Sequence, residues 1–298
     1  MREYEYLTLD VFTDQRFGGN PLAVFPQGEG LSDDEMQSIA REFNYSETTF
    51  VLPPSDPANT AKVRIFTPVY ELPFAGHPNV GTGFAIAMHS GADSLRFEEI
   101  AGLVTVQIDR GQDGTLQGAT IAAPRSLQEG VAVTSRLVVD CVGLTEEDLA
   151  TDTHEPLVAG VGTDFVFAEL KTTTALETAS PNPAMFRRAA DELPELEGRF
   201  ALFLYVREAP ERVRARMFAP LGGVLEDPAT GSGAAALAAL LVSFAPGDDV
   251  TLAFEIDQGI EMGRPSRLIA TASKTGEGPV EATVGGACVP VMRGTLAL

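Results

Sequence analysis

The stretch Arg64-Ile-Phe-Thr-Pro68 recurs 152 residues later as Arg216-Met-Phe-Ala-Pro220. Further along, Pro78-Asn-Val-Gly-Thr-Gly-Phe-Ala85 recurs as Pro228-Ala-Thr-Gly-Ser-Gly-Ala-Ala235, at an offset of 150 residues. Two ordered matches, separated by about half of the chain, indicate an internal duplication. The sequence therefore predicts two related domains: residues 1–127 form the first, with residues 287–298 returning to it, and residues 128–286 form the second.

Each copy has the same local pattern. A short strand ends at Phe-x-Pro, a loop follows, and a proline is expected to open a helix at its first position, where its missing N–H has no cost. The two helices, over residues 81–88 and 231–242, are apolar on nearly every side, which is typical of a buried helix. We therefore expect an α+β fold in which each domain is a sheet rolled around one central helix.

Strand-like alternation surrounds both central helices. The expected strands are Tyr4–Thr13, Ala23–Phe25, Thr49–Leu52, Lys62–Phe66, Leu95–Phe97, Val104–Asp109, Ala119–Ala122, Val131–Val133, Phe165–Leu170, Ala201–Val206, Val213–Phe218, Val250–Glu255, Arg267–Thr271, Ala282–Val284 and Cys288–Leu298. Two further segments, Asp33–Phe43 and Pro183–Leu193, have the pattern of amphipathic helices. The first is preceded by Ser32, with Glu35 three residues on, which is a capping-box signature.

Each central helix carries a pair of glycines near its start, Gly81 and Gly83 in the first copy and Gly231 and Gly233 in the second. Glycine inside a helix costs about 1 kcal/mol relative to alanine. A pair of them therefore indicates that either a neighbouring strand or a ligand approaches the helix backbone closely. Because both copies share the pair, we favour the ligand.

The chain has 42 acidic and 21 basic side chains and a net charge of −21. Such a surface repels phosphate backbones, which disfavours nucleic-acid binding. The N-terminal residues MREYEYLTLDVF alternate as a strand does and do not have the pattern of a leader, and the longest apolar stretch, residues 233–245, is too short to span a bilayer. We expect a cytoplasmic protein with no membrane partner.

Cys141 and Cys288 belong to no Cys-x-x-Cys pair, and the three histidines lack metal-ligand spacing, so no metal site is expected. The segment around Gly81 is not a phosphate-binding loop, because no Gly-Lys-Ser/Thr follows it. Thr230-Gly-Ser-Gly-Ala234 does not match the Gly-x-Ser-x-Gly signature of serine hydrolases. These observations disfavour metalloenzymes, nucleotide-binding proteins and serine hydrolases.

His77 and Asp227 each precede one of the paired prolines. An ionisable group at a helix start lies in the positive end of the helix field, beside free backbone N–H groups. Two such starts facing each other across a cleft between the domains would bind a small carboxylate substrate. Asp227 taken alone also fits simple N-capping. The hydroxyl groups of Thr82 and Ser232 occupy matching places and are candidates to bind the same ligand.

Glu47, in Asn44-Tyr-Ser-Glu-Thr-Thr-Phe50, is a third candidate and has no counterpart in the second copy. From the residues alone two interpretations stay open. The carboxylate is either a solvated group at a strand edge or a general base that abstracts a proton next to a carbonyl or an unsaturated system. In the second case the chemistry of the two halves is asymmetric.

Five motifs run in order over nearly the whole chain: Phe17-Gly-Gly-Asn-Pro-Leu-Ala-Val24, Ser46-Glu-Thr-Thr-Phe50, Phe66-Thr-Pro-Val-Tyr-Glu-Leu-Pro-Phe-Ala-Gly-His-Pro78, Glu226-Asp-Pro-Ala-Thr-Gly-Ser232 and Gln258-Gly-Ile-Glu-Met-Gly-Arg-Pro-Ser266. Together they resemble the PhzF-like phenazine-biosynthesis family. The resemblance implies a diaminopimelate-epimerase-like fold of two pseudo-symmetric domains, with the active site between them and often a homodimer.

The resemblance also implies a cofactor-independent isomerase that acts on a small cyclic dihydro-hydroxyanthranilate. By that resemblance Glu47 is the acid/base that moves the proton, and His77 and Asp227 complete the catalytic set. Asn79 stands where the family commonly has threonine, which implies an altered substrate preference. The residues expected to bind the substrate are Asn20, Gly76, Gly231 and Ser232.

Two alternatives rank below this prediction. A racemase or epimerase on the same fold needs two opposed thiols, and the helix starts hold no cysteine. A non-catalytic scaffold would be expected to lack the acid/base, whereas Glu47, His77 and Asp227 are all present.

Overall fold

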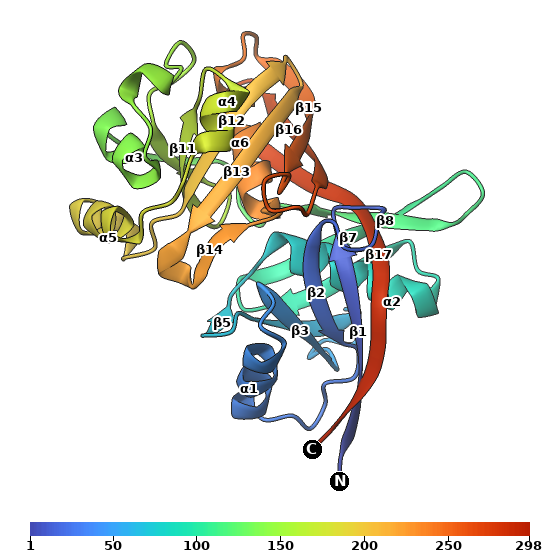
Figure 1. Cartoon of the computed structure of the whole chain (residues 1–298). Coiled ribbons are helices and arrows are strands. Elements are labelled where there is room, and N and C mark those ends of the chain that lie inside the picture. Colours follow the sequence, from blue (N-terminus) through green and yellow to red (C-terminus); the bar gives the residue numbers. More distant parts are fainter. The chain divides into compact units, whose positions relative to one another are not determined.

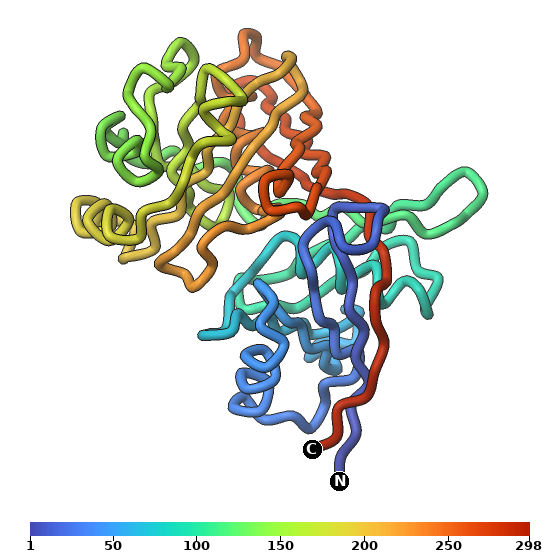
Figure 2. The backbone as a smooth tube through the Cα atoms, in the orientation of Figure 1, coloured from blue at the N-terminus to red at the C-terminus, as the bar shows by residue number.

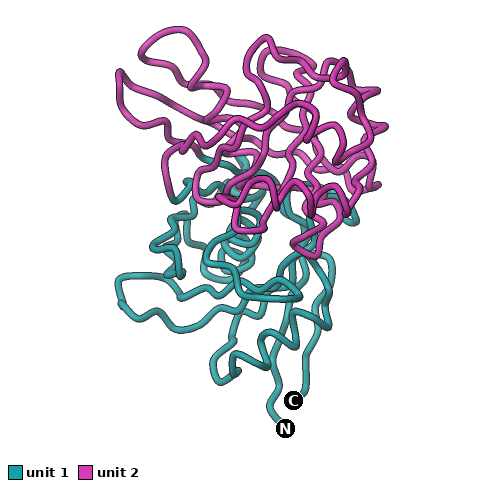
Figure 3. The backbone as a smooth tube through the Cα atoms, turned by 90° about the vertical axis from the view of Figure 1, so that its left-hand side faces the viewer, with its two compact units in different colours: residues 1–124, 283–298 teal, residues 125–282 magenta.

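The computed structural model describes all 298 residues. It divides into two compact units: unit 1 comprises Met1–Pro124 and Thr283–Leu298, and unit 2 comprises Arg125–Ala282 (Figure 3). None of the helices is both long enough and apolar enough to cross a membrane.

In unit 1, eight strands pair in a closed ring in the order β17-β1-β2-β3-β4-β6-β7-β8, with β8 returning to β17. The C-terminal strand lies antiparallel to the first, so both chain ends lie side by side (Figures 1 and 2). The strands are β1 (Glu3–Val11), β2 (Asn20–Phe25), β3 (Glu47–Leu52), β4 (Ala61–Phe66), β6 (Ser94–Glu99), β7 (Gly102–Arg110), β8 (Leu116–Ala122) and β17 (Glu281–Ala297), and the short β5 (Glu71–Leu72) pairs with β4.

The ring encloses helix α2 (Gly76–Ser90), which packs against β1, β2, β3, β7 and β8. The small residues of this helix are needed for that packing. A Cβ atom added at Gly83 would lie 2.6 Å from Cγ1 of Val106, and one added at Gly81 would lie 2.6 Å from Cδ2 of Leu22. The preference for a ligand at these glycines is therefore wrong: strand side chains fill the space.

In unit 2, seven strands pair in the order β9-β10-β11-β12-β13-β15-β16. Helix α6 (Gly231–Phe244) packs against β10 and β11 near one end of this row and against β15 and β16 at the other, so the sheet curves around it. A Cβ atom at Gly233 would lie 2.7 Å from the ring of Phe203, again because a strand side chain occupies the space. The strands are β9 (Gln128–Ala132), β10 (Leu157–Gly160), β11 (Asp164–Glu169), β12 (Leu202–Ala209), β13 (Arg212–Ala219), β15 (Asp249–Gln258) and β16 (Ser266–Thr275), and the short β14 (Val224–Asp227) pairs with β13.

The two units repeat one pattern of strand directions. From β1 to β7 the successive pairs are antiparallel, parallel, antiparallel, parallel and antiparallel. From β10 to β16 the same sequence of pairs recurs. The predicted α+β fold, with a sheet rolled around a central helix in each of two pseudo-symmetric halves, is confirmed.

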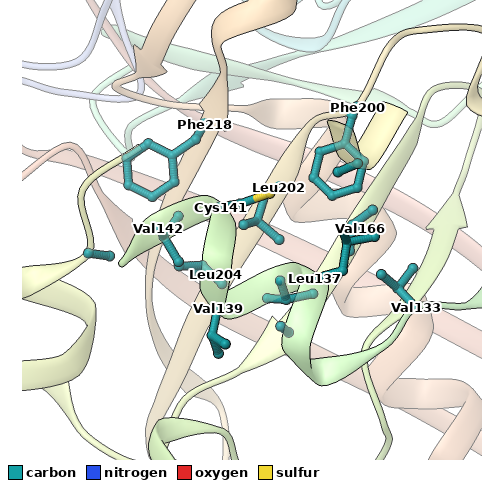
Figure 4. Close-up of a cluster of buried hydrophobic side chains, with 14 of the residues drawn as sticks. Val133, Leu137, Val139, Cys141, Val142, Val166, Phe200, Leu202, Leu204 and Phe218 are labelled. Carbon is teal, nitrogen blue, oxygen red and sulfur yellow. The ribbon is translucent and has the colours of Figure 1, made fainter. Parts of the chain in front are cut away.

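Further helices lie outside the sheets. In unit 1, α1 (Asp33–Phe43) has the predicted bounds and the predicted capping box between Ser32 and Glu35. In unit 2, α3 (Ser135–Val142), α4 (Thr173–Thr178) and α5 (Pro183–Glu192) share a buried cluster with β11, β12 and β13, which includes Cys141 and Phe218 (Figure 4). Short 3₁₀ turns complete the chain at Glu146–Asp148, Pro194–Leu196 and Pro220–Gly222.

The predicted starts of both central helices are wrong. Helix α2 begins at Gly76, so Pro78 is its third residue, and α6 begins three residues after Pro228. A proline at the third position has no cost either, because the first four N–H groups of a helix have no partner within it. In the second copy, Thr230 takes the N-cap position. His77 therefore lies inside its helix, whereas Asp227 ends strand β14.

Candidate functional site

Glu47 and His77 lie together in unit 1. Glu47 opens β3, and the parallel pairing of β2 and β3 sets it beside Leu22. His77 is the second residue of α2, the helix that the strands enclose. Nε2 of His77 lies 3.3 Å from Oε2 of Glu47. Across this contact the ring nitrogen makes no well-aligned hydrogen bond.

The His77 ring is held from its other side. The residue is 5 % exposed. Burial lowers the pKa of His77 to about 3, although a hydrogen bond to the backbone carbonyl of Pro21 opposes that shift. Because a carbonyl only accepts, the ring nitrogen facing Pro21 must carry a hydrogen. Nδ1 is that nitrogen, and in the neutral ring Nε2 presents its lone pair toward Glu47.

This geometry can hold one hydrogen between the two groups. A carboxylate oxygen and the lone pair of a neutral imidazole both accept, so they have no attraction unless one of them carries a hydrogen. The carboxylic acid form of Glu47 would donate to Nε2, and the carboxylate form would accept from a protonated ring. Either form is an acid paired with a base.

Two more of the predicted residues adjoin this pair. Asn20 is the first residue of β2, is fully buried and immediately precedes Pro21, whose carbonyl holds the His77 ring. Gly76 is the first residue of α2, where its backbone N–H has no partner inside the helix. The chain thus brings Asn20, Glu47, Gly76 and His77 into one region of unit 1.

In unit 2, Asp227 is the centre of a second polar cluster. It is 7 % exposed, and its Oδ2 accepts from Oγ1 of Thr230 at 2.7 Å. The fully buried Gln258 joins both residues: its Nε2 donates to the Asp227 carbonyl at 2.8 Å and to Oγ1 of Thr230 at 3.0 Å. Its Oε1 accepts from the backbone N–H of Thr230 at 3.1 Å. These bonds fix the Asp227 carboxylate just ahead of α6.

Gly231 and Ser232 are the first two residues of α6. Their N–H groups are among the four that have no partner inside the helix, and the positive end of the helix dipole lies there. This start can bind an anion, with the Ser232 hydroxyl group as a further donor. The matching hydroxyl of Thr82 is engaged elsewhere: its Oγ1 lies 2.8 Å from Oγ1 of Thr49, and both residues are fully buried. The expectation that Thr82 binds the ligand is therefore not supported.

No group of three or more His, Cys, Asp or Glu residues is arranged to hold a metal ion. Both cysteines are buried free thiols.

A family model described as phenazine biosynthesis-like protein matches residues 9–294. The chain belongs to that family. A curated member from Pseudomonas aeruginosa, trans-2,3-dihydro-3-hydroxyanthranilate isomerase, is 36 % identical over 277 residues, which cover 92 % of each chain. An uncharacterized isomerase from Mesorhizobium japonicum is 37 % identical over 307 residues and 99 % of each chain. This member of the phenazine biosynthesis-like family is an isomerase.

Solved structures support the fold of the family. A PhzF-family phenazine biosynthesis protein from Bacillus anthracis matches with a TM-score of 0.85 at 24 % identity, over 100 % of both chains. A predicted epimerase from Pseudomonas aeruginosa matches with a TM-score of 0.79 at 29 % identity, over 99 % of both chains. A hydroxyproline epimerase from Agrobacterium vitis shares the fold at 16 % identity, with a TM-score of 0.63 over 100 % of this chain and 93 % of the other.

Two polar residues of this PhzF-family chain were not among the predicted site residues. Thr230 and Gln258 hold Asp227 in place, as described above. Each had a signal in the sequence. Thr230 follows Asp227 by three residues, a spacing at which a hydroxyl and a carboxylate before a helix can bond. Gln258 opens the last of the five family motifs, yet a lone glutamine at the end of a strand indicates no chemistry by itself.

Proposed function

We propose that the protein isomerises a small carboxylate-bearing substrate by moving one proton, with Glu47 as the acid/base and His77 as its partner. The observation that supports this most is the 3.3 Å contact of Nε2 of His77 with Oε2 of Glu47, beneath a ring whose Nδ1 is held by Pro21. The pair is mostly buried: the side chains of His77 and Glu47 are 6 % and 16 % exposed.

The resting state follows from the burial of His77. Since burial lowers the pKa of the ring to about 3, His77 is neutral at pH 7. In the proposal, the hydrogen shared by the two groups then belongs to Glu47, which rests as a carboxylic acid beside Nε2. Because the buried His77 ring is a weak base, it does not keep the hydrogen of Glu47. The Glu47 acid can therefore give that hydrogen to a substrate that binds next to it.

In the proposed reaction the acid form of Glu47 gives its proton to one carbon of a conjugated substrate. The C–H bond forms with the electron pair of a double bond. The resulting carboxylate then takes a proton from a second carbon, and the electron pair of that C–H bond restores a double bond at the new position. Glu47 ends as it began, and no cofactor or redox partner is needed for the balance.

We propose that the substrate carboxylate is bound by backbone N–H groups at helix starts. The start of α2 offers the N–H of Gly76, with the buried Asn20 in the adjoining strand. The start of α6 offers Gly231 and Ser232, next to the fixed carboxylate of Asp227. In the proposal Asp227 binds a polar group of the substrate.

The name of the 36 % identical relative suggests trans-2,3-dihydro-3-hydroxyanthranilate as the first compound to test. Incubation in D₂O, followed by proton NMR, reports both the new double-bond position and the carbon that acquires deuterium. The wild-type enzyme should produce a monodeuterated isomer. The variant Glu47→Gln should produce none while ligand binding persists, and Glu5→Gln, an exposed strand glutamate, serves as the matched control.

Racemisation by two thiols is disfavoured by the chemistry of both cysteines. Burial raises the pKa of Cys141 to about 12 and raises the pKa of Cys288 well above its ordinary value. A thiol must ionise to abstract a proton, so neither is a competent base near neutral pH. Inversion of a stereocentre in an amino- or imino-acid panel, with no double-bond isomerisation, would favour the epimerase alternative. If no compound is converted, the result would favour the alternative of a non-catalytic scaffold.

The homodimer and the cytoplasmic location remain predictions. Sedimentation equilibrium of the purified chain measures the first, and cell fractionation of the tagged protein measures the second.

A further inference from the structure

The turn between β15 and β16 belongs to the last of the five family motifs, of which only Gln258 has a place in the proposed site. The two strands form an antiparallel hairpin, and residues 259–265 make its turn (Figure 1). The backbone N–H groups of Met262 and Arg264 both donate to the carbonyl of Gly259, at 3.2 and 3.0 Å. The turn is therefore closed by its own hydrogen bonds.

Strand β13 brings this turn to the segment that enters α6. One edge of β13 pairs with β12, and its other edge is shared by β15 and β14. On that shared edge Ala215 pairs with Gln258, and Met217 pairs with Asp227. Because the two positions are two residues apart on one strand, the chain that leaves β15 lies close to the chain that leaves β14. Pro228, which directly follows Asp227, is buried there.

Gly259 lies against Pro228 and leaves no room for a side chain. A Cβ atom added at Gly259 would lie 2.5 Å from the carbonyl oxygen of Pro228, 3.1 Å from its Cα atom and 2.5 Å from the carbonyl oxygen of Arg264. These are backbone atoms, which cannot rotate away as the end of a flexible side chain can. The φ angle of Gly259 is +76°, in the left-handed region that favours glycine. The turn thus contacts the segment before α6 through its backbone.

An ion pair joins the turn to β13. The guanidinium group of Arg214 donates to Oε1 of Glu261 at 2.7 Å, and the two side chains are 16 % and 13 % exposed. Arg214 also pairs with Glu177 of α4 at 3.1 Å, but the Glu177 side chain is 50 % exposed. Exposed ion pairs contribute little, whereas breaking a buried pair is costly. Glu261 is therefore the partner that fixes the turn on the sheet.

Unit 1 makes the corresponding contact with different atoms. In the repeated pattern of strands, β6 and β7 correspond to β15 and β16, and the short β5 corresponds to β14. The turn between β6 and β7 also bonds the segment that leads into the central helix, because the N–H of Ala101 donates to the carbonyl of Pro73 at 3.0 Å. A hairpin turn supports the segment before the central helix in both halves.

We propose that the turn between β15 and β16 is a positioning element for the substrate site of unit 2. Gly259 supports Pro228, and the ion pair of Glu261 with Arg214 keeps the turn in that place. Asp227 directly precedes Pro228, and α6 begins three residues after it, so a displaced turn would move both. The consequence for catalysis rests on the proposed binding roles of Asp227 and of the α6 start, whereas the support of Pro228 does not.

Two pairs of matched variants separate this support from general damage. Gly259→Ala places a methyl group against Pro228 at a φ of +76°, whereas Gly263→Ala adds the same group in the same turn at +70°, with no atom within 4 Å. The backbone strain is therefore similar and only the contact differs. Glu261→Ala removes the partner that Arg214 has on the turn, and Glu177→Ala removes its partner on α4.

The support is measured without any substrate, by NMR of the amide groups at the α6 start. Gly259→Ala and Glu261→Ala should shift the ¹H and ¹⁵N resonances of Gly231 and Ser232, and the two control variants should leave them in place. Unmoved resonances in Glu261→Ala, or equal shifts in the controls, would overturn the proposal. Glu261→Ala decides this outcome even if the methyl group of Gly259→Ala prevents folding.

The consequence for binding is measured with trans-2,3-dihydro-3-hydroxyanthranilate, the compound in the name of the 36 % identical relative. KM should rise on the order of tenfold in Gly259→Ala and less in Glu261→Ala. The change in kcat should be smaller, because Glu47 lies in unit 1. A variant that is only less stable would lose active enzyme and keep its KM, so an unchanged KM in both variants would overturn the positioning role. If the wild-type enzyme converts no substrate, the proposed function fails, and the NMR result still decides whether the turn supports the α6 start.

Discussion

Arg216 forms a bidentate ion pair with Glu226: Nε donates to Oε1 at 2.8 Å and NH2 donates to Oε2 at 2.9 Å. Its NH1 donates to the carbonyls of Leu176 and Ala179, each at 2.8 Å. The side chain is 7 % exposed, so this cation is buried with its partners satisfied. Because Asp227 is the next residue after Glu226, the ion pair fixes the strand that carries a proposed site residue. Arg64 in unit 1 forms the same kind of bidentate ion pair with Glu71.

Replacing one partner of this pair should be strongly destabilising. Arg216→Met leaves the Glu226 carboxylate and two buried carbonyls without their donor, and breaking a buried pair in this way costs about 3–5 kcal/mol. Urea unfolding measures the loss. Arg188→Met is the control, since Arg188 pairs with Glu192 on the exposed face of α5 and such surface pairs contribute about 0–1 kcal/mol. Equal losses in the two variants would contradict the account of Arg216.

The glycines of the central helices give a second prediction. A methyl group at Gly233 would lie 2.7 Å from the Phe203 ring, so Gly233→Ala should destabilise the protein by about 1–3 kcal/mol through overpacking, despite the better helix propensity of alanine. Gly222→Ala is the matched control, because nothing lies within 4 Å of an added Cβ there. The thermal unfolding midpoints of both variants measure the effect. A higher midpoint for Gly233→Ala would contradict the prediction and would show that the strand carrying Phe203 moves to make room for the methyl group.

The buried His77 predicts a distinct dependence of stability on pH. With a pKa lowered from 6.5 to about 3, the folded state binds fewer protons than the unfolded state throughout that window. Stability from this group should therefore rise with pH from about 3 to 6.5, by up to about 1.4 kcal/mol per pH unit. The difference between wild type and His77→Gln, measured by urea unfolding at several pH values, isolates the effect. A flat difference would mean that the ring is not desolvated.

Gln258 gives a fourth prediction. Gln258→Met removes the acceptor for the Thr230 N–H and both donors from Nε2, so Asp227 loses its fixed position. We expect a higher KM with a smaller change in kcat, and a loss of stability of about 1–3 kcal/mol from the unsatisfied buried N–H. Gln117→Met, an exposed position on β8, should change neither quantity. Steady-state kinetics on the substrate identified by the NMR assay check the result, and an unchanged KM would argue against a binding role for Asp227.

Much of the fold follows from local patterns. The bounds of α1 could be predicted because its capping box and its apolar spacing agree, and the offset between the Arg64 and Arg216 motifs predicts the duplication. Strand β10, over Leu157–Gly160, could not be found, because its four residues are all apolar or small and show no alternation. Helices α3 and α4 are also short, and they depend on packing against the sheet more than on their own propensity.

The site was predicted in part. Family motifs point to Glu47 and His77, but their contact depends on the parallel pairing of β2 and β3 and on the enclosed α2, which no local pattern encodes. The helix start was misplaced because a proline is equally acceptable at several positions of a first turn. The ligand interpretation of Gly81, Gly83 and Gly233 was wrong because the sequence does not say which side chain lies against a helix, and side chains such as Val106 and Phe203 occupy that space.

The central claim is that Glu47 gives its proton to one carbon of the substrate and then takes a proton from another. The most direct test follows repeated turnovers of a substrate with deuterium at the carbon that loses its hydrogen, in ordinary water, with wild type and Glu47→Gln. In wild type, the deuterium that Glu47 takes up in one turnover should appear in part at the new C–H position of the next product, and the variant should form no product. Turnover by Glu47→Gln at a near-normal rate would contradict the assignment.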